Sequence, residues 1–314
     1  MWVPTLSLRA RSTAAGAPVS RRGWILFAAM GVIWGVPYLL IKVAVDDLRP
    51  GTLVFVRTTI GALLLVPLAA GRGALRPLLA RWRWLLVYTL VEVTVPWFLL
   101  SDAETRLSSS LAGLLVSAVP LMGALLVMAV GGDDRLGPRR IAGLLVGVGG
   151  VAALLGLDVG GGNLGAVAEI GVVTVGYAVG PMIIARQLRG LPAMGVVGAS
   201  LGVSALAWAP YGLLHLPSSL PSARVGLSIV ALGVVCTAIA FLVFFALIGE
   251  VGPARATVIT YVNPAVAVAL GVTVLGEPFT RGTAVGFVLI LAGCFLATSR
   301  SRDQAPVLRG TVSA

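Results

Sequence analysis

The chain has 314 residues, of which 58% are hydrophobic and 11% are charged, and its mean hydropathy is +1.01. A soluble domain carries about 25% charged residues, so this composition excludes an ordinary water-soluble protein. A net charge of +11 would suit a nucleic-acid-binding protein, but the positions of the charges, given below, exclude that reading.

Ten apolar stretches follow one another along the chain. They lie at 24–45, 51–70, 84–103, 107–130, 139–157, 164–186, 194–214, 225–248, 254–275 and 280–298. Each is continuous and close to the roughly 20 residues that a helix needs to cross a bilayer, unlike the short alternating segments of an outer-membrane barrel. The sequence therefore predicts an all-α integral membrane protein with ten transmembrane helices.

The first and last residues are polar. We expect residues 1–23 and 299–314 to be disordered cytoplasmic tails, since neither has an apolar pattern. Residues 1–23 also lack the short apolar core and small-residue cleavage site of a signal peptide.

The basic residues indicate the orientation of the chain. With both termini in the cytoplasm, 17 of the 23 Lys and Arg residues fall on the cytoplasmic side, five fall outside, and Arg57 lies within a span. Positive charge concentrates in cytoplasmic loops, so this orientation is the predicted one, with anionic lipid headgroups as partners and no nucleic acid. In a bacterium, the membrane is then the inner membrane.

Spans one to three carry most of the candidate site residues. Trp34 and Tyr38, one turn apart in the first span, offer aromatic surfaces for a cation or a flat substrate, and Trp97 offers another in the third. Bulk packing is the alternative explanation for each. Arg57 and Glu92 are ionisable groups at membrane depth, where each requires a functional or structural reason.

Glu92 is the candidate proton-coupling residue. Burial disfavours a charged carboxylate, so this group could bind and release a proton or hold a substrate amine. The alternative is a structural ion pair with Arg57, which residue counting places within reach at roughly 7 Å along the axis.

Spans four, six and nine complete the candidate site. Pro120 and the Asn263-Pro264 pair fall near the midplane, where proline opens a carbonyl that must face protein or a cavity. Asn263 and Tyr261 therefore form a predicted polar wall. Tyr177, with Glu169, is a further candidate in span six.

The chain repeats itself at an offset of 144 residues. Ala112 corresponds to Ala256, Pro120 to Pro264, and Asp133 to Glu277, and after one deletion two glycine pairs continue the match: Gly143 with Gly286, and Gly150 with Gly293. Five spans are an odd number, so the second copy enters the membrane from the opposite side. We therefore predict two inverted five-helix repeats, 24–157 and 164–298.

The repeated residues resemble the EamA-type repeat of the drug/metabolite transporter superfamily. In the second half the resemblance rests on Leu232-Gly233, Ala238, Ala240, Ala246-Leu247, Ala254–Ala256, Tyr261, Asn263-Pro264, Leu275-Gly276-Glu277, Gly286 and Ala292-Gly293. In the first half it rests on Ile33-Trp34-Gly35, Lys42-Val43-Ala44, Phe55-Val56-Arg57 and Pro120, with a departure at Asp133-Asp134. It implies ten helices, cytoplasmic termini and export of small metabolites, amino acids or drugs, with Arg57 orienting a substrate carboxylate or holding the bundle.

The predicted function is a secondary transporter driven by an ion gradient. The sequence has no phosphate-binding loop, and we expect no cofactor and no metal, since Cys236 and Cys294 lie within spans and His215 is the one histidine. An integral membrane enzyme acting on lipid-linked substrates is the alternative, but the short loops carry no catalytic constellation. Glycines at small-xxx-small spacing suit packing within the chain or a homodimer equally.

Overall fold

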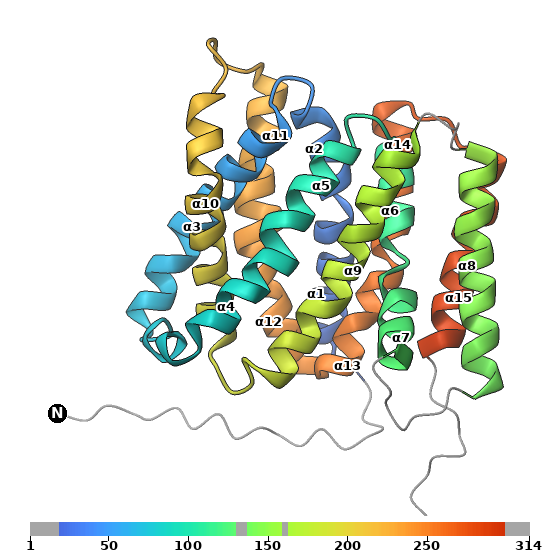
Figure 1. The fold of residues 1–314 in the computed structure, drawn as a ribbon, viewed down its shortest axis with the longest axis horizontal. Coiled ribbons are helices and arrows are strands. Elements are labelled where there is room, and N and C mark those ends of the chain that lie inside the picture. The colour runs from blue at the N-terminus through green and yellow to red at the C-terminus, as the bar shows by residue number, and fades with distance from the viewer. Residues whose placement is uncertain (1–18, 130–136, 159–162, 299–314) are drawn as a thin grey trace, which may run out of the picture.

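The computed structural model describes residues 19–129, 137–158 and 163–298 (Figure 1). Over these ranges the chain is a bundle of helices without a strand, and ten of its helical stretches are long and apolar enough to cross a membrane. The predicted fold class is confirmed. The expectations for the two tails and for Asp133-Asp134 fall largely or wholly outside the described residues.

The helices divide into five spans for each repeat. The first repeat contains α1 (Arg21–Gly35), α2 (Pro37–Ala44), α3 (Pro50–Gly71), η1 (Arg76–Arg81), α4 (Trp82–Tyr88), η2 (Thr89–Thr94), α5 (Val95–Ala103), α6 (Ser109–Val116), α7 (Val119–Ala129) and α8 (Pro138–Asp158). The second contains α9 (Leu164–Arg186), α10 (Ala193–Leu214), α11 (Ala223–Gly233), η4 (Val234–Ile239), α12 (Ala240–Val251), α13 (Pro253–Ala256), η5 (Thr257–Tyr261), α14 (Asn263–Leu275) and α15 (Arg281–Thr298).

Several spans are interrupted, although their apolar sequence is continuous. Span one breaks between α1 and α2 at Pro37, and spans four and nine restart at α7 and α14, whose second residues are Pro120 and Pro264. Proline has no N–H to donate to the preceding turn, so a helix restarts more easily at proline than it continues through it. Spans one, four and nine are therefore each divided into shorter helices.

Spans three and eight contain a turn of π-helix at corresponding places. The segments are η2 in the first repeat and η4 in the second, and the repeat offset aligns Glu92 in η2 with Cys236 in η4. A π-helical turn leaves carbonyl groups free of their usual partners and is frequent at functional sites. Both repeats therefore carry the same local irregularity, but only one places an acid in it.

The contact between α8 and α15 shows that the repeats are inverted. The carbonyl of Gly150 approaches Gly286, and the carbonyl of Gly143 approaches Gly293, so the two helices run antiparallel. Gly150 corresponds to Gly293 in the repeat, and Gly286 corresponds to Gly143, so the two contacts are equivalent under the repeat. An axis along the membrane normal would relate parallel helices, whereas an axis in the membrane plane relates antiparallel ones, so the axis lies in the plane.

The contact between α3 and α10 obeys the same symmetry. Phe55 lies against Gly212, and Leu65 lies against Gly198, so these helices are also antiparallel. Both have 22 residues, and Pro67 holds the same position in α3 as Pro210 holds in α10. This proline pair was present in the sequence and extends the repeat into span seven, where few other residues mark it.

The two ends of the bundle are distinguished here by the chain termini. The terminal face, at the bottom of Figure 1, is where α1 begins and α15 ends. The distal face, at the top, carries the turns that join α2 to α3, α5 to α6, α10 to α11 and α14 to α15.

Candidate functional site

Arg57 lies where the two repeats meet. Its guanidinium is buried, its Nε donates a hydrogen bond to Thr237 Oγ1 at 3.1 Å, and its Cζ lies 3.8 Å from the centroid of the Trp97 ring. Thr237 belongs to the π-helical segment η4 of the other repeat. A cation over an indole face is stabilised by the ring quadrupole, so both contacts fix the guanidinium in place.

Two predicted tyrosines surround this arginine. Tyr38 of α2 and Tyr177 of α9 both interact electrostatically with Arg57 and with each other, and Tyr177 also interacts with Trp97. Tyr38 packs beside Gly113 of α6, where a Cβ would lie 3.5 Å from the tyrosine ring. Four of the eight predicted site residues thus converge, from four different spans. We call Tyr38, Arg57, Trp97 and Tyr177 the central cluster.

Glu92 lies next to the central cluster but does not pair with Arg57. Its carboxylate rests against Gly180 of α9, and its buried Oε2 has no hydrogen-bond partner among the described residues. Tyr88 and Tyr177 lie near enough to interact with it electrostatically. The ion pair considered from the sequence is wrong, because η2 directs Glu92 toward α9 while Arg57 points toward η4.

The other three predicted site residues have structural partners elsewhere. Trp34 packs on Phe244 and Phe241 of α12, with ring centroids 4.7 and 6.0 Å apart. The Tyr261 hydroxyl interacts with Thr298 Oγ1 at 2.6 Å, at the terminal end of α15. These contacts separate Trp34 and Tyr261 from the central cluster.

Asn263 joins α14 to α1. With its amide oriented to suit the neighbouring carbonyls, the nitrogen donates to Ile259 O at 3.0 Å and to Gly31 O at 3.1 Å. This contact satisfies two backbone groups at the break before Pro264. The predicted polar wall is therefore a helix junction.

Glu169, the secondary candidate in span six, forms an ion pair at the distal face. Its carboxylate accepts from Arg106 Nη2 at 2.6 and 2.7 Å, and Asp102 is a second acid beside the same guanidinium. Donating these hydrogen bonds to Glu169 raises the pKa of Arg106, which keeps this exposed group charged. Glu169 therefore lies at the surface, away from the central cluster.

Trp208 was not identified from the sequence. Its Nε1 donates to the carbonyl of Thr94 at 3.2 Å, and its ring stacks on Phe98 with a centroid separation of 4.7 Å. Thr94 ends the π-helical segment η2, so Trp208 satisfies a carbonyl in the irregular region. The sequence signal was a tryptophan within an apolar span, and such a residue is ordinarily interpreted as a packing residue.

Glu104 was also missed. It directly follows α5, its side chain is fully buried, and both its carboxylate oxygens lack a hydrogen-bond partner among the described residues. Its position at the end of an apolar run made it resemble an exposed loop acid. Only the packing of other spans over this turn shows otherwise.

Two interactions close the distal face around Glu104. Lys42 Nζ donates to the carbonyls of Glu104 and Leu107 at 2.6 and 2.8 Å. The Glu277 carboxylate accepts from Ser109 N, Ser110 N and Ser110 Oγ at 2.7, 2.9 and 2.5 Å. A carboxylate at a helix N-terminus is favoured by the free N–H groups and the helix dipole, so Glu277 holds α6 to the end of α14. We call Lys42, Glu277 and the turn from Glu104 to Ser110 the distal seal.

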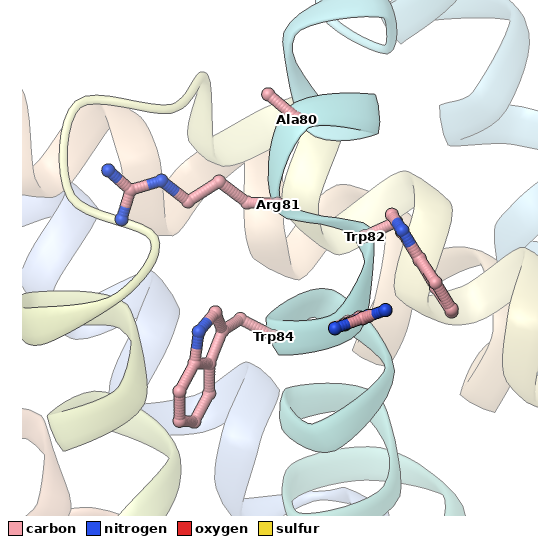
Figure 2. Close-up of a pocket in the computed structure, with 5 residues that line it drawn as sticks. Ala80, Arg81, Trp82 and Trp84 are labelled. Carbon is pink, nitrogen blue, oxygen red and sulfur yellow. The ribbon is translucent and has the colours of Figure 1, made fainter.

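The exposed residues around Trp82 form a separate hollow at the terminal face. Figure 2 shows Arg81, Trp82 and Trp84 pointing in different directions from the start of α4. Arg81 Nη1 donates to Gln187 O at 2.5 Å, and both tryptophans are exposed. Exposed tryptophans beside arginines at the end of a span are typical of an interfacial anchor.

Comparisons with known proteins agree with this architecture. The sequence profile of the EamA-like transporter family matches residues 21–156 and 167–299. The "Uncharacterized transporter YvbV" of Bacillus subtilis is 26% identical over 285 residues, which cover 89% of this chain and 92% of that protein. The "Uncharacterized inner membrane transporter YedA" of Escherichia coli is 28% identical over 265 residues, or 81% and 83%. A crystal structure with 23% identity has the same fold, with a TM-score of 0.62 over 88% of this chain.

Proposed function

Because this chain belongs to the EamA-like transporter family and is a membrane transporter, we propose that it exports small metabolites, amino acids or drugs on an ion gradient. The names of its relatives identify transporters without a substrate, a direction or a driving ion. These finer assignments rest on the site and on the charge distribution.

The central cluster is the observation that carries the substrate-binding part of the proposal. A buried guanidinium between the repeats uses Nε for Thr237 and one face for Trp97. Arginine has five N–H donors in a fork that fits a carboxylate or phosphate oxygen pair. Tyr38 and Tyr177 add hydroxyl groups and aromatic surface beside it. This combination suits a small molecule with an anionic group and a flat or apolar portion.

The direction and orientation follow from the charges. Both termini are proposed to lie in the cytoplasm, since 17 basic residues fall on that side against five on the other. The distal face is then external. With the distal seal formed, a substrate would enter the central cluster from the cytoplasmic side, as an exporter requires.

The proposed source of energy is a proton gradient acting on Glu92. The sequence contains no nucleotide-binding loop, and Glu92 is a carboxyl group with a buried, unpartnered oxygen next to the central cluster. Tyr177 interacts with both Glu92 and Arg57, so protonation of Glu92 would alter the electrostatic environment of Arg57. An enzyme acting on lipid-linked substrates is the second candidate, but the relatives of this chain are named as transporters.

The test compares cells that express the natural chain with cells that express Arg57→Gln. Untargeted metabolomics of the medium should show compounds that accumulate outside only with the natural chain, and anions should predominate among them. Uptake of those compounds into liposomes containing the purified protein should then depend on an imposed pH gradient. Equal export by Arg57→Gln, at equal protein level in the membrane, would refute the assignment of the central cluster. Turnover of a lipid-linked compound without transport would favour the enzyme.

A further inference from the structure

Glu104 is a buried acid that does not belong to the central cluster. Its side chain is 0% exposed, and neither carboxylate oxygen accepts a hydrogen bond from any described residue. An ionised carboxylate in such a position would be unfavourable, since burial removes its water and the attraction of Lys42 and Arg57 compensates only in part. A neutral carboxyl group avoids most of that cost.

The groups that face Glu104 come from several elements. Lys42 and Tyr38 approach from α2, Arg57 approaches from α3, and Glu277 approaches from the end of α14. Tyr177 of α9 also interacts with it.

Lys42 would be the natural counter-ion, but its ammonium donates to the backbone carbonyls of Glu104 and Leu107 rather than to the Glu104 carboxylate. No ion pair joins Lys42 and Glu104 within the part of the chain that the structure describes. Burial raises the pKa of the Glu104 carboxyl well above its usual range, and the attraction of Lys42 opposes this only in part.

We propose that Glu104 is a proton-binding site governed by the distal seal, protonated while the seal is closed and deprotonated when the seal opens. On opening, the O–H bond of the carboxyl breaks, the proton passes to water at the distal face, and the carboxylate remains beside the Lys42 ammonium. On closing, the carboxylate takes a proton from the same water. The ligand of this site is the proton itself. The site rests on the proposed function and deepens the proposed coupling by adding an outer acid directly after the span that carries Glu92.

The seal that would open is formed unequally by the two repeats. Every residue of α6 is buried, whereas Arg255 and Val258, in the segment of the second repeat that corresponds to α6, are exposed. Ser109, whose N–H binds Glu277, corresponds to Pro253, which has no N–H to donate. The backbone hydrogen bond that Ser109 donates to Glu277 at the distal end therefore cannot be repeated at Pro253. Exchange of the two repeat conformations would open the distal end.

The sign of the pH dependence follows from this arrangement. The closed state binds the proton more tightly than the open state, in which water solvates the carboxylate. Below the usual glutamate pKa of about 4.3 both states are protonated and pH has no effect. Above this pKa, each pH unit raises the equilibrium constant for opening by up to tenfold, until the pH passes the pKa of Glu104 in the closed state.

Hydrogen exchange of the full chain in lipid nanodiscs tests the site. The amides of residues 108–116 exchange through opening of the seal, so their rates report the opening equilibrium. Glu104→Gln keeps the shape of the protonated acid and cannot ionise. The rate in the natural chain divided by the rate in Glu104→Gln, at each pH from 5 to 8, removes the intrinsic pH dependence of exchange. This ratio should rise with pH by up to tenfold per unit, and Glu169→Gln, a surface acid at the same face, should leave the rise unchanged.

A flat ratio would overturn the proposal, and so would loss of the rise in Glu169→Gln. If gel filtration shows that Glu104→Gln does not remain folded, infrared spectroscopy of the Glu92→Gln variant tests the site instead. This variant lacks the other buried acid among the described residues, so a protonated carboxyl band would come from Glu104. That variant should show the carbonyl band of a protonated carboxyl at pH 7, and absence of the band would overturn the site. Neither measurement requires a substrate. A rising ratio without any transport would refute the proposed function alone, while gradient-driven transport with a flat ratio would refute the proton site alone.

Discussion

Arg57 of the first repeat donates a hydrogen bond to Thr237 of the second repeat, across the interface between α3 and η4. Thr237 is fully buried, and its hydroxyl in turn donates to Leu232 O at 2.7 Å, five residues earlier in the same span. One threonine therefore bonds a carbonyl of its own span and orients a buried cation. This relationship makes the position of Arg57 depend on the irregular geometry of the opposite repeat.

Thr237→Val should destabilise the protein and weaken transport together. Valine has the shape of threonine without the hydroxyl, so Arg57 Nε would lose its acceptor inside the bundle. Leaving one partner of a charged hydrogen bond unsatisfied costs about 1–3 kcal/mol. Thermal unfolding in detergent and transport in liposomes measure the two effects. Thr58→Val is the matched control, since the Thr58 hydroxyl bonds only to carbonyls of its own helix. Equal effects of both substitutions would contradict the role of Thr237.

Glu92→Gln should keep the fold and abolish gradient-driven transport. Glutamine has a similar volume but cannot exchange a proton, and no ion pair with Arg57 is lost because none is present. The unfolding temperature should stay the same or rise, since a neutral amide is easier to bury than an acid. Liposome assays with and without a pH gradient check this. Full proton-coupled transport by a well-folded Glu92→Gln protein would falsify the coupling role.

Gly180→Ala should abolish gradient-driven transport as Glu92→Gln does, because the added methyl group would displace the Glu92 carboxylate. A Cβ at Gly180 would overlap the Glu92 carboxylate, and forcing extra atoms into a packed site costs typically about 1–3 kcal/mol. Gly171→Ala is the control on the same helix, because nothing lies within 4 Å of its Cβ position. Combining Gly180→Ala with Glu92→Ser should restore part of the lost stability, as contacting residues are coupled. Additive losses in the double variant would show that the two residues act independently.

The charge distribution predicts which face is cytoplasmic. Reporter fusions at the carboxyl terminus should give a cytoplasmic signal, whereas fusions within residues 158–163, which join the two repeats, should give an external one. The antiparallel contact of α8 with α15 already requires that the two repeats enter from opposite sides. A cytoplasmic signal from the 158–163 fusion would be incompatible with the proposed orientation.

The sequence by itself determined the class of the protein, the number of spans and the inverted repeat. These features depend on composition, on apolar length and on residues repeated at a fixed offset, all of which are local or periodic. Tyr38, Arg57, Trp97 and Tyr177 were among the eight site residues predicted from the sequence, but nothing in the sequence separated them from Trp34, Tyr261 and Asn263, which have other partners.

The tertiary structure decided which side chains meet at a given depth. Counting placed Arg57 and Glu92 within reach along the axis, but the π-helical turn at Glu92 rotates the acid toward Gly180 of α9. Thr237, in the π-helical turn of the second repeat, accepts from Arg57 of the first, and Trp208 donates to Thr94 in the π-helical turn of the first repeat. Glu104 is buried only because other spans cover its turn. Rotation about a helix axis and packing between distant spans are properties of the assembled bundle, so no pattern within a single span could predict them.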